Sequence, residues 1–209
     1  MNSVLTFLRR RTPHTRTGKL LLSIAVLGAA ASIAGLGTFA TFTSSTSASH
    51  TVASGTVVIA LGTSGTSANR LSVGATGLAP GDTLERAVDV INNGTLDMAS
   101  VTLATTATTS SLLDTDTTNG LQLVVDKCSV AWTESGPPYT YTCGGTLTNV
   151  IASTSVIQSS LNLGSLTSGS TTHYRVKLTF PSGAGNTLQN QSSTIQYSFT
   201  GTQRAATSK

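Results

Sequence analysis

From residue 55 onward, short apolar runs alternate with runs of Ser, Thr, Gly and Asn. In HYRVKLTF (173–180) every second residue is apolar, which predicts a strand whose core-facing side chains are Tyr174, Val176, Leu178 and Phe180. The segment STIQYSF (193–199) repeats the pattern with Ile195, Tyr197 and Phe199. No stretch of this region keeps a 3.6-residue apolar period long enough for a major helix. The pattern predicts one all-β domain over residues 55–203, an antiparallel, jelly-roll-like β-sandwich.

Two other segments predict a strand and a turn. GTVVIAL (55–61) is a short run rich in β-branched residues, which is typical of a strand. Between residues 79 and 103, two apolar runs are separated by Asn92, Asn93 and Gly94, which predicts a β-hairpin at that point. Residues 204–209 are predicted to form a polar tail.

The longest apolar run lies near the N-terminus, at LLLSIAVLGAAASIAGLG (20–37), and follows a basic segment. Thr38 and Ala40 are small, as a signal peptidase requires on the leader side of its cut. The run could instead be retained as an anchor, since about 18 apolar residues can just span a bilayer. Its many Ala and Gly residues, and the absence of a basic stop after it, favour an N-terminal signal-peptide helix, with the signal peptide covering residues 1–40. We therefore predict export, with contact to the membrane only through the uncleaved leader.

The positive charge belongs to this leader. The whole chain carries 12 Lys and Arg against 8 Asp and Glu, but only seven of the basic residues lie beyond residue 40, where all eight acidic ones lie. The predicted secreted part therefore has a net charge of −1. Because a nucleic-acid-binding surface needs clustered positive charge, we expect no nucleic-acid partner.

The two cysteines bracket the turn-forming segment ESGPP in CSVAWTESGPPYTYTC (128–143). A hairpin centred between Ser135 and Gly136 would place Cys128 opposite Cys143, Val130 opposite Tyr141, and Trp132 opposite Tyr139. Export makes a Cys128–Cys143 disulfide plausible, and closing this loop is worth about 3 kcal/mol in the chain-entropy model. The alternative, a metal site, would need more soft ligands than two cysteines provide.

Several segments, taken in order, resemble the TasA/camelysin family of exported bacterial fibre-forming proteins. LGTFATF with TVASGTVVIAL resembles the family's cleavage region and first mature strand. The resemblance continues in LAPGDTLERAVDVINNGTLDMASVTL (78–103) and returns in the segment from LTSGSTTHYRVKLTF to FTGTQ (166–203). The middle, 104–155, matches poorly, so the cysteine hairpin is interpreted as peculiar to this branch.

The resemblance implies a jelly-roll subunit that polymerises head to tail into extracellular or biofilm-matrix fibres by donor-strand complementation. It also implies cleavage between Ala40 and Thr41 by a dedicated, SipW-type signal peptidase, with further matrix or nucleating proteins as partners. Residues 41–54 would then be the donor segment, with an inward-facing set of Phe42, Ser44, Thr46 and Ala48. This Ser/Thr-rich segment is also consistent with a disordered tail.

The name camelysin also implies a metalloendopeptidase, which is the enzymatic alternative. A zinc protease needs two or three His or Glu ligands and a carboxylate base, and no H-E-x-x-H occurs. Outside the leader only His50 and His173 remain, and His173 is predicted to be an exposed histidine beside Arg175 and Lys177. We therefore expect no enzyme activity, catalytic residues, cofactor or metal. A monomeric surface adhesin or binding module is the third hypothesis.

DTDTTNG (114–120) is similar to a calcium-binding loop. Its spacing is one residue off, and Val125 occupies the position of the bidentate Glu. A solvated turn is favoured over calcium binding by Asp114 and Asp116.

The leader prediction has a direct test. The secreted protein should begin at Thr41, because the cut follows the small residue Ala40. N-terminal sequencing of exported protein checks this, and a chain that still began at Met1 would contradict both the cleavage site and the donor segment behind it.

Overall fold

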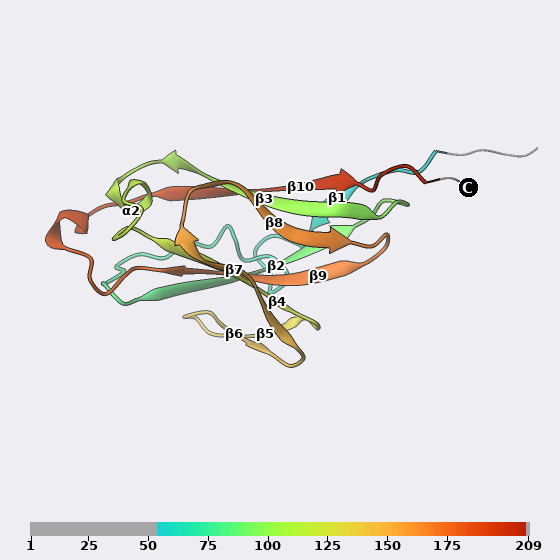
Figure 1. Ribbon diagram of the computed structural model, residues 1–209. Coiled ribbons are helices and arrows are strands. Elements are labelled where there is room, and N and C mark those ends of the chain that lie inside the picture. The colour runs from blue at the N-terminus through green and yellow to red at the C-terminus, as the bar shows by residue number, and fades with distance from the viewer. Residues whose placement is uncertain (1–53, 208–209) are drawn as a thin grey trace, which may run out of the picture. The chain divides into compact units, whose positions relative to one another are not determined.

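The computed structural model describes residues 54–207, which form two antiparallel sheets packed face to face (Figure 1). One sheet has the strand order β1-β2-β9-β4-β7 and the other β10-β3-β8, while β5 and β6 form a separate hairpin. The strands are β1 (Ile59–Leu61), β2 (Thr83–Asn92), β3 (Met98–Thr109), β4 (Gln122–Cys128), β5 (Trp132–Ser135), β6 (Thr140–Cys143), β7 (Leu147–Ser155), β8 (Gln158–Leu166), β9 (Thr171–Thr179) and β10 (Thr194–Gln203). The predicted all-β, antiparallel sandwich is confirmed. The leader, the cleavage site Ala40–Thr41 and the donor residues Phe42, Ser44, Thr46 and Ala48 lie outside the described residues.

The core lies between the two sheets. The predicted alternation of 173–180 is confirmed, since its four apolar side chains are at most 6% exposed. Strands of both sheets contribute the other central side chains, among them Val88, Val90, Val101, Leu103, Leu123 and Val125, each fully buried. Ile195, Tyr197 and Phe199 of β10 are partly buried against the same cluster. The period-2 pattern therefore determines which face of each strand is inside.

Helical structure is minor in the described residues. α2 (Leu112–Thr115) is a single turn capped by Ser111, whose hydroxyl accepts from Leu113 N, with Asp114 completing a capping box. A 3-10 turn occupies Asn186–Leu188. Within residues 54–207, no helix is long and apolar enough to cross a membrane.

The hairpin predicted at Asn92, Asn93 and Gly94 is wrong, because β2 and β3 belong to different sheets. The Asn92 side chain is fully buried and donates to the carbonyls of Leu96 at 2.9 Å and Leu166 at 3.2 Å. Its Oδ1 accepts from Gly94 N at 2.9 Å. These bonds stabilise a crossing from one sheet to the other, and such a crossing lets both strands place their apolar faces in the same core.

The first strand is also shorter than predicted. Only three residues of 55–61 form β1, which pairs with the last three residues of β2. Residues 55–58 still contact the crossing, since Asn93 N donates to Val58 O at 2.9 Å. A Cβ at Gly94 would lie 2.4 Å from Thr56 O, so this close approach requires glycine.

Replacing Asn92 with Ala should lower the free energy of unfolding by about 2–3 kcal/mol, because buried carbonyls and an N–H would lose their partner. Urea denaturation measures the change. Asn93→Ala is the matched control, since the Asn93 side chain is exposed and should tolerate the substitution. Equal effects of the two substitutions would contradict the role of Asn92 at the crossing.

Candidate functional site: a groove, a strap and a disulfide-linked hairpin

A groove of about 800 Å³ opens between the first residues of β2 and the first residues of β10. Its walls are mainly apolar and include Leu71, Leu78, Leu84, Leu178, Phe180, Leu188, Ile195 and Tyr197. A smaller hollow of about 230 Å³ is lined by some of the same residues and extends toward Leu61. Burial raises the pKa of Tyr197 to about 12.

The groove exists because both sheets end beside it. β10 pairs with β3 on one side and is the edge strand on the other. β1 pairs with residues 90–92 of β2. The residues that follow β1 continue along the same edge of β2 as far as Ala87, whose carbonyl accepts a hydrogen bond from Arg70 N at 2.9 Å. Toward Thr83, residues 71–78, which we call the strap, run past this edge with no helix or strand of their own.

Arg86 is the one charged residue among those lining the groove. It lies between Leu84 and Val88 on the core-facing side of β2 and is 7% exposed. Its guanidinium donates to three carbonyl oxygens: Val73 O at 2.5 Å, Gly74 O at 3.0 Å and Glu85 O at 2.6 Å. Burial lowers the pKa of Arg86 from its usual value. The side chain remains a cation whose charge is balanced by backbone dipoles.

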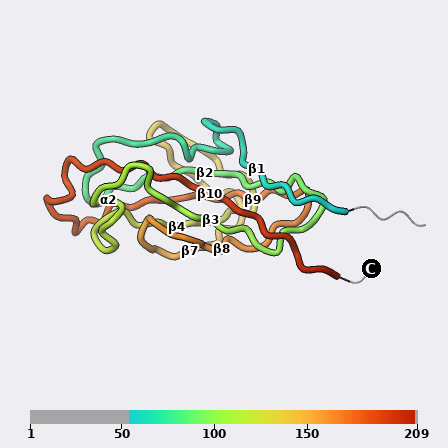
Figure 2. The backbone as a smooth tube through the Cα atoms, turned by 90° about the horizontal axis from the view of Figure 1, so that it is seen from above, coloured from blue at the N-terminus to red at the C-terminus, as the bar shows by residue number. Residues whose placement is uncertain are grey.

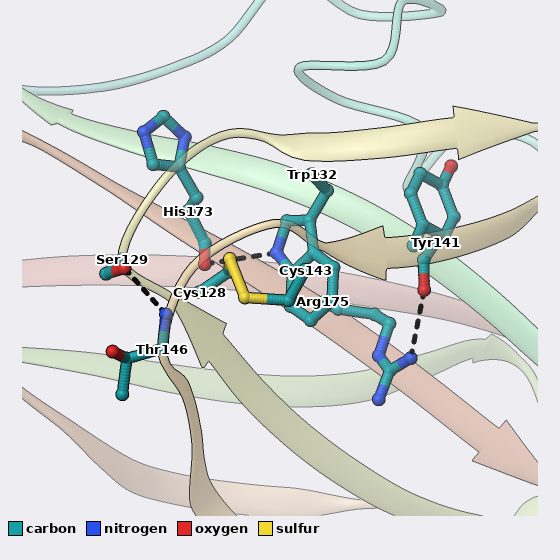
Figure 3. Close-up of a disulfide and its surroundings, with 8 residues drawn as sticks. All are labelled: Cys128, Ser129, Trp132, Tyr141, Cys143, Thr146, His173 and Arg175. Carbon is teal, nitrogen blue, oxygen red and sulfur yellow. Dashed lines mark hydrogen bonds between the residues drawn. A yellow bond between two sulfur atoms is a disulfide. The ribbon is translucent and has the colours of Figure 1, made fainter.

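The two cysteines form a disulfide, with Cα atoms 5.6 Å apart (Figure 3). The register predicted for the hairpin is wrong, because Trp132 pairs with Cys143 and Glu134 with Tyr141. After Cys128 the chain leaves β4 in a loop, where Ser129 and Thr146 exchange hydrogen bonds of 3.0 and 2.9 Å. Strand pairing therefore begins only at Trp132, and the disulfide joins the end of β4 to the end of β6.

The β5–β6 hairpin covers polar residues on the outer face of the five-stranded sheet (Figures 1 and 3). Trp132 Nε1 donates to His173 O at 3.2 Å, and the Arg175 guanidinium lies 4.8 Å from the Trp132 ring centre. Arg175 also pairs with Asp126 at 2.6 Å and with Glu85 at 3.2 Å. This small second core contains the buried residues Ala87, Cys128, Trp132 and Tyr141.

His173 was predicted to be exposed, but in the structure its side chain is mostly covered. Its side chain is 21% exposed, and its Nδ1 lies 2.6 Å from Asp89 Oδ1 on the neighbouring strand. The alternation of β9 predicts its polar face but not the packing of a hairpin against that face.

The hairpin also contacts the segment that leads into the strap. Arg70 donates to both carboxylate oxygens of Glu134, at 2.9 and 2.8 Å, and its guanidinium lies 4.6 Å from the Tyr139 ring centre. Tyr141 donates to the same carboxylate at 2.8 Å, and burial raises the pKa of Tyr141 to about 12. The hydrogen bonds from Arg70 lower the pKa of Glu134 below its usual value.

The aspartates of the calcium-like loop are engaged in local hydrogen bonds. Asp114 is 4% exposed and accepts from Ser110, Ser111 and Ser193. Asp116 accepts from the N–H groups of Thr118 and Asn119, both at 2.9 Å, as in a surface turn. Among the described residues, no three His, Cys, Asp or Glu side chains gather as metal ligands would.

The groove, the strap and the two arginines that hold the strap were missed by the sequence analysis. One signal for them was available. In TLERAVDV (83–90), every second residue faces the core, as Leu84, Val88 and Val90 do. Arg86 falls in the same series, which places a cation on the inner face of the strand. The contact between Arg70 and Glu134 gave no comparable signal, because 64 residues separate them.

These features define an antiparallel β-sandwich with an open apolar groove at one strand edge and a disulfide-linked hairpin over one sheet. Residues 17–208 match the camelysin metallo-endopeptidase family, and the chain belongs to this family.

No curated protein matches the sequence. Among solved structures, the chain is similar to one from a structure entitled "AvmM Catalyzes Macrocyclization in Alchivemycin A Biosynthesis", with 13% identity. The match covers 73% of this chain and 91% of that chain, and its TM-score of 0.30 is too low to support an argument.

The family description implies a metal, and a metalloprotease holds its zinc with two or three His or Glu side chains. His173 is the one histidine within residues 54–207, and its Nδ1 contacts Asp89. Arg175 lies two residues further along β9 on the same face, and its positive charge disfavours a nearby dication. The described residues therefore do not fit a zinc site with two or three His or Glu ligands. His14 and His50 lie outside the described residues.

The ion pair between Arg70 and Glu134 predicts a pH dependence. A carboxylate whose pKa is lowered in the folded state contributes stability above its unfolded pKa, about 4.3, and this contribution disappears as the pH falls through the folded value. Between pH 7 and pH 3, the free energy of unfolding should therefore fall more in the wild type than in Glu134→Gln. Urea denaturation at both pH values measures this, and identical losses would show that the pair adds no stability.

Proposed function

We propose that this protein is a secreted structural subunit that polymerises into extracellular, biofilm-matrix fibres by donor-strand complementation. In this proposal, residues 41–49 of one subunit enter the groove of the next. The observation that carries it is the apolar groove beside the free edge of β10, about 800 Å³ in volume. An exposed edge strand provides a row of backbone donors and acceptors, and pockets beside it take alternate side chains of an added strand.

The division of strands supports the same interpretation. A jelly roll distributes eight strands over two sheets. Here the eight strands of the sandwich divide into five and three, and the three-stranded sheet ends at β10 beside the groove. One strand added along β10 would cover Ile195 and Tyr197, which line the groove and are only partly buried.

The position of the chain ends favours assembly between subunits. The described chain begins and ends at one end of the sandwich, whereas α2 and the loop between β9 and β10, both part of the groove region, lie at the opposite end (Figures 1 and 2). A segment that leaves one end and enters the groove of a second copy makes a head-to-tail contact. Such a heterologous contact produces an open filament when the rotation between successive copies does not close a ring.

The chemistry of the segment fits the groove. Residues 41–49, TFTSSTSAS, are uncharged and contain no proline, so each residue can join a strand ladder. With Phe42 directed inward, Ser44, Thr46 and Ala48 follow on the same face, giving one large anchor and a series of small side chains. An apolar groove accepts such a strand without burying an unpaired charge.

A metalloendopeptidase is the alternative function, and the description of the family favours it. The two functions separate in one assay. Chelator-sensitive cleavage of casein by purified protein that forms no fibres would support the enzyme, whereas fibres without proteolysis support the structural subunit. A folded protein that showed neither would support a monomeric adhesin.

Deletion of residues 41–49 should leave a folded monomer that does not polymerise. Phe42→Asp should act similarly, because an unpaired buried charge costs several kcal/mol. Electron microscopy and sedimentation of the mature and variant proteins at matched concentration measure fibre yield. Normal fibres from the truncated protein would exclude the donor-strand mechanism.

The acceptor side has a matched pair of variants on β10. Ile195 lines the groove, and its neighbour Gln196 is exposed on the opposite face. Ile195→Asp should reduce fibre yield strongly, because it places a charge against the entering strand, while Gln196→Asp should leave the yield near normal. Equal yields from both would show that the strand docks elsewhere.

A further inference from the structure

The strap, residues 71–78, forms one wall of the groove but has no strand pairing. Its apolar ends, Leu71 and Leu78, pack against the core, while the residues between them are largely exposed. A segment with so few backbone hydrogen bonds opens at a low free-energy cost. Its position therefore depends on side-chain contacts. Two arginines supply those contacts.

Arg86 holds the strap from within the groove. Its Nε and one terminal nitrogen donate to Val73 O and Gly74 O of the strap, and its other terminal nitrogen donates to Glu85 O on β2. One side chain therefore ties the middle of the strap to β2.

Arg70 holds the strap from the hairpin side. It precedes the strap by one residue, Val73 N donates to its carbonyl at 2.9 Å, and its guanidinium makes the bidentate contact with Glu134 of β5. Tyr139 of the hairpin lies against both arginines, with ring-centre distances of 4.6 Å to Arg70 and 5.4 Å to Arg86. A bidentate arginine–carboxylate pair fixes geometry as well as charge.

The hairpin can position Glu134 and Tyr139 because it is fastened at its base. The disulfide joins the residue that ends β4 to the residue that ends β6. Trp132 bonds to the backbone of β9, and Tyr141 N donates to Glu85 at 3.3 Å. A continuous series of contacts thus runs from the disulfide through the hairpin and the two arginines to the wall of the groove.

We infer that the disulfide-linked hairpin is a latch that holds the strap in place as one wall of the groove and so limits how readily a strand enters it. The consequence for strand entry rests on the proposed function, whereas the latch itself does not. The competing interpretation is that the hairpin only shields the polar outer face of the sheet around Arg175. In that case the hairpin could be loosened without any effect on residues 71–78.

Hydrogen–deuterium exchange of the full mature chain tests the latch directly. In Glu134→Gln, amide exchange of residues 72–77 should rise roughly fivefold, because the variant loses the charged partner of Arg70. Exchange of β3 and β4 should stay unchanged. The control is Asp97→Asn, which removes the same charge from an exposed carboxylate that accepts from Ser168 N, outside these contacts. Unchanged strap exchange in Glu134→Gln would overturn the latch.

A second experiment removes the disulfide with the double variant Cys128→Ala and Cys143→Ala. Amide exchange of residues 72–77 should rise as much in this variant as in Glu134→Gln. If the double variant does not fold, Glu134→Gln and Arg70→Lys decide the question, since lysine keeps the charge but loses the two-pronged contact.

Growth of wild-type seeds by each variant tests the consequence. A strap that opens more often should raise the elongation rate roughly fivefold, in proportion to the accessible fraction. If the variants elongate fibres at the wild-type rate although exchange of residues 72–77 has risen, the latch does not limit strand entry into the groove. That result would leave the proposed function intact. If the wild type forms no fibres, the proposed function fails, and the exchange of residues 72–77 still decides whether the latch exists.

Discussion

Among the described residues, the outer edge of β10 is unpaired and lies beside a groove with apolar side chains. Within residues 54–207, the three residues of β1 pair with β2 in the other sheet, and the strap lines the groove without making a strand ladder. Edge strands in monomeric proteins are commonly protected by Lys, Pro or a covering element. β10 has neither Lys nor Pro over its ten residues. This open edge is the basis for the groove, for the partial exposure of Ile195 and Tyr197, and for the proposal that another subunit supplies a strand.

The arginines show how the fold manages charge around that edge. Each of Arg70, Arg86 and Arg175 lies against an aromatic ring of the hairpin, and each makes its polar contacts within partly buried surroundings. Guanidinium groups suit this environment because they are weakly hydrated and donate in several fixed directions. Arg175 and Arg70 have carboxylate partners, whereas the hydrogen bonds of Arg86 go to backbone carbonyls. The strap is therefore held in two ways, by hydrogen bonds from Arg86 to its backbone and by the ion pair between Arg70 and Glu134.

Membership of the camelysin family leaves two functions with different requirements. A protease needs ligands and a base around one reacting centre, and the described residues place their single histidine in a pair with Asp89 instead. A fibre subunit needs no reacting centre. It needs an acceptor edge, a free segment of compatible chemistry and an arrangement that propagates. The groove and the five-and-three division of strands are compatible with the first requirement, and the uncharged composition of 41–49 is compatible with the second.

The sequence by itself determined the all-β class and the inner face of β9, because alternation with period 2 is a local property of a strand. It also identified the cysteine partners, whose spacing brackets a single turn. Only the tertiary structure decided the sheet crossing at Asn92, the hairpin register and the groove. The Asn-Gly pair predicts a tight turn, but the shared core requires β2 and β3 to lie in different sheets. The register depends on where β4 ends, and the groove depends on contacts such as Arg70 with Glu134, 64 residues apart. Contacts between residues so distant in the chain leave no periodic trace in the sequence, because they form only when the whole sandwich has folded.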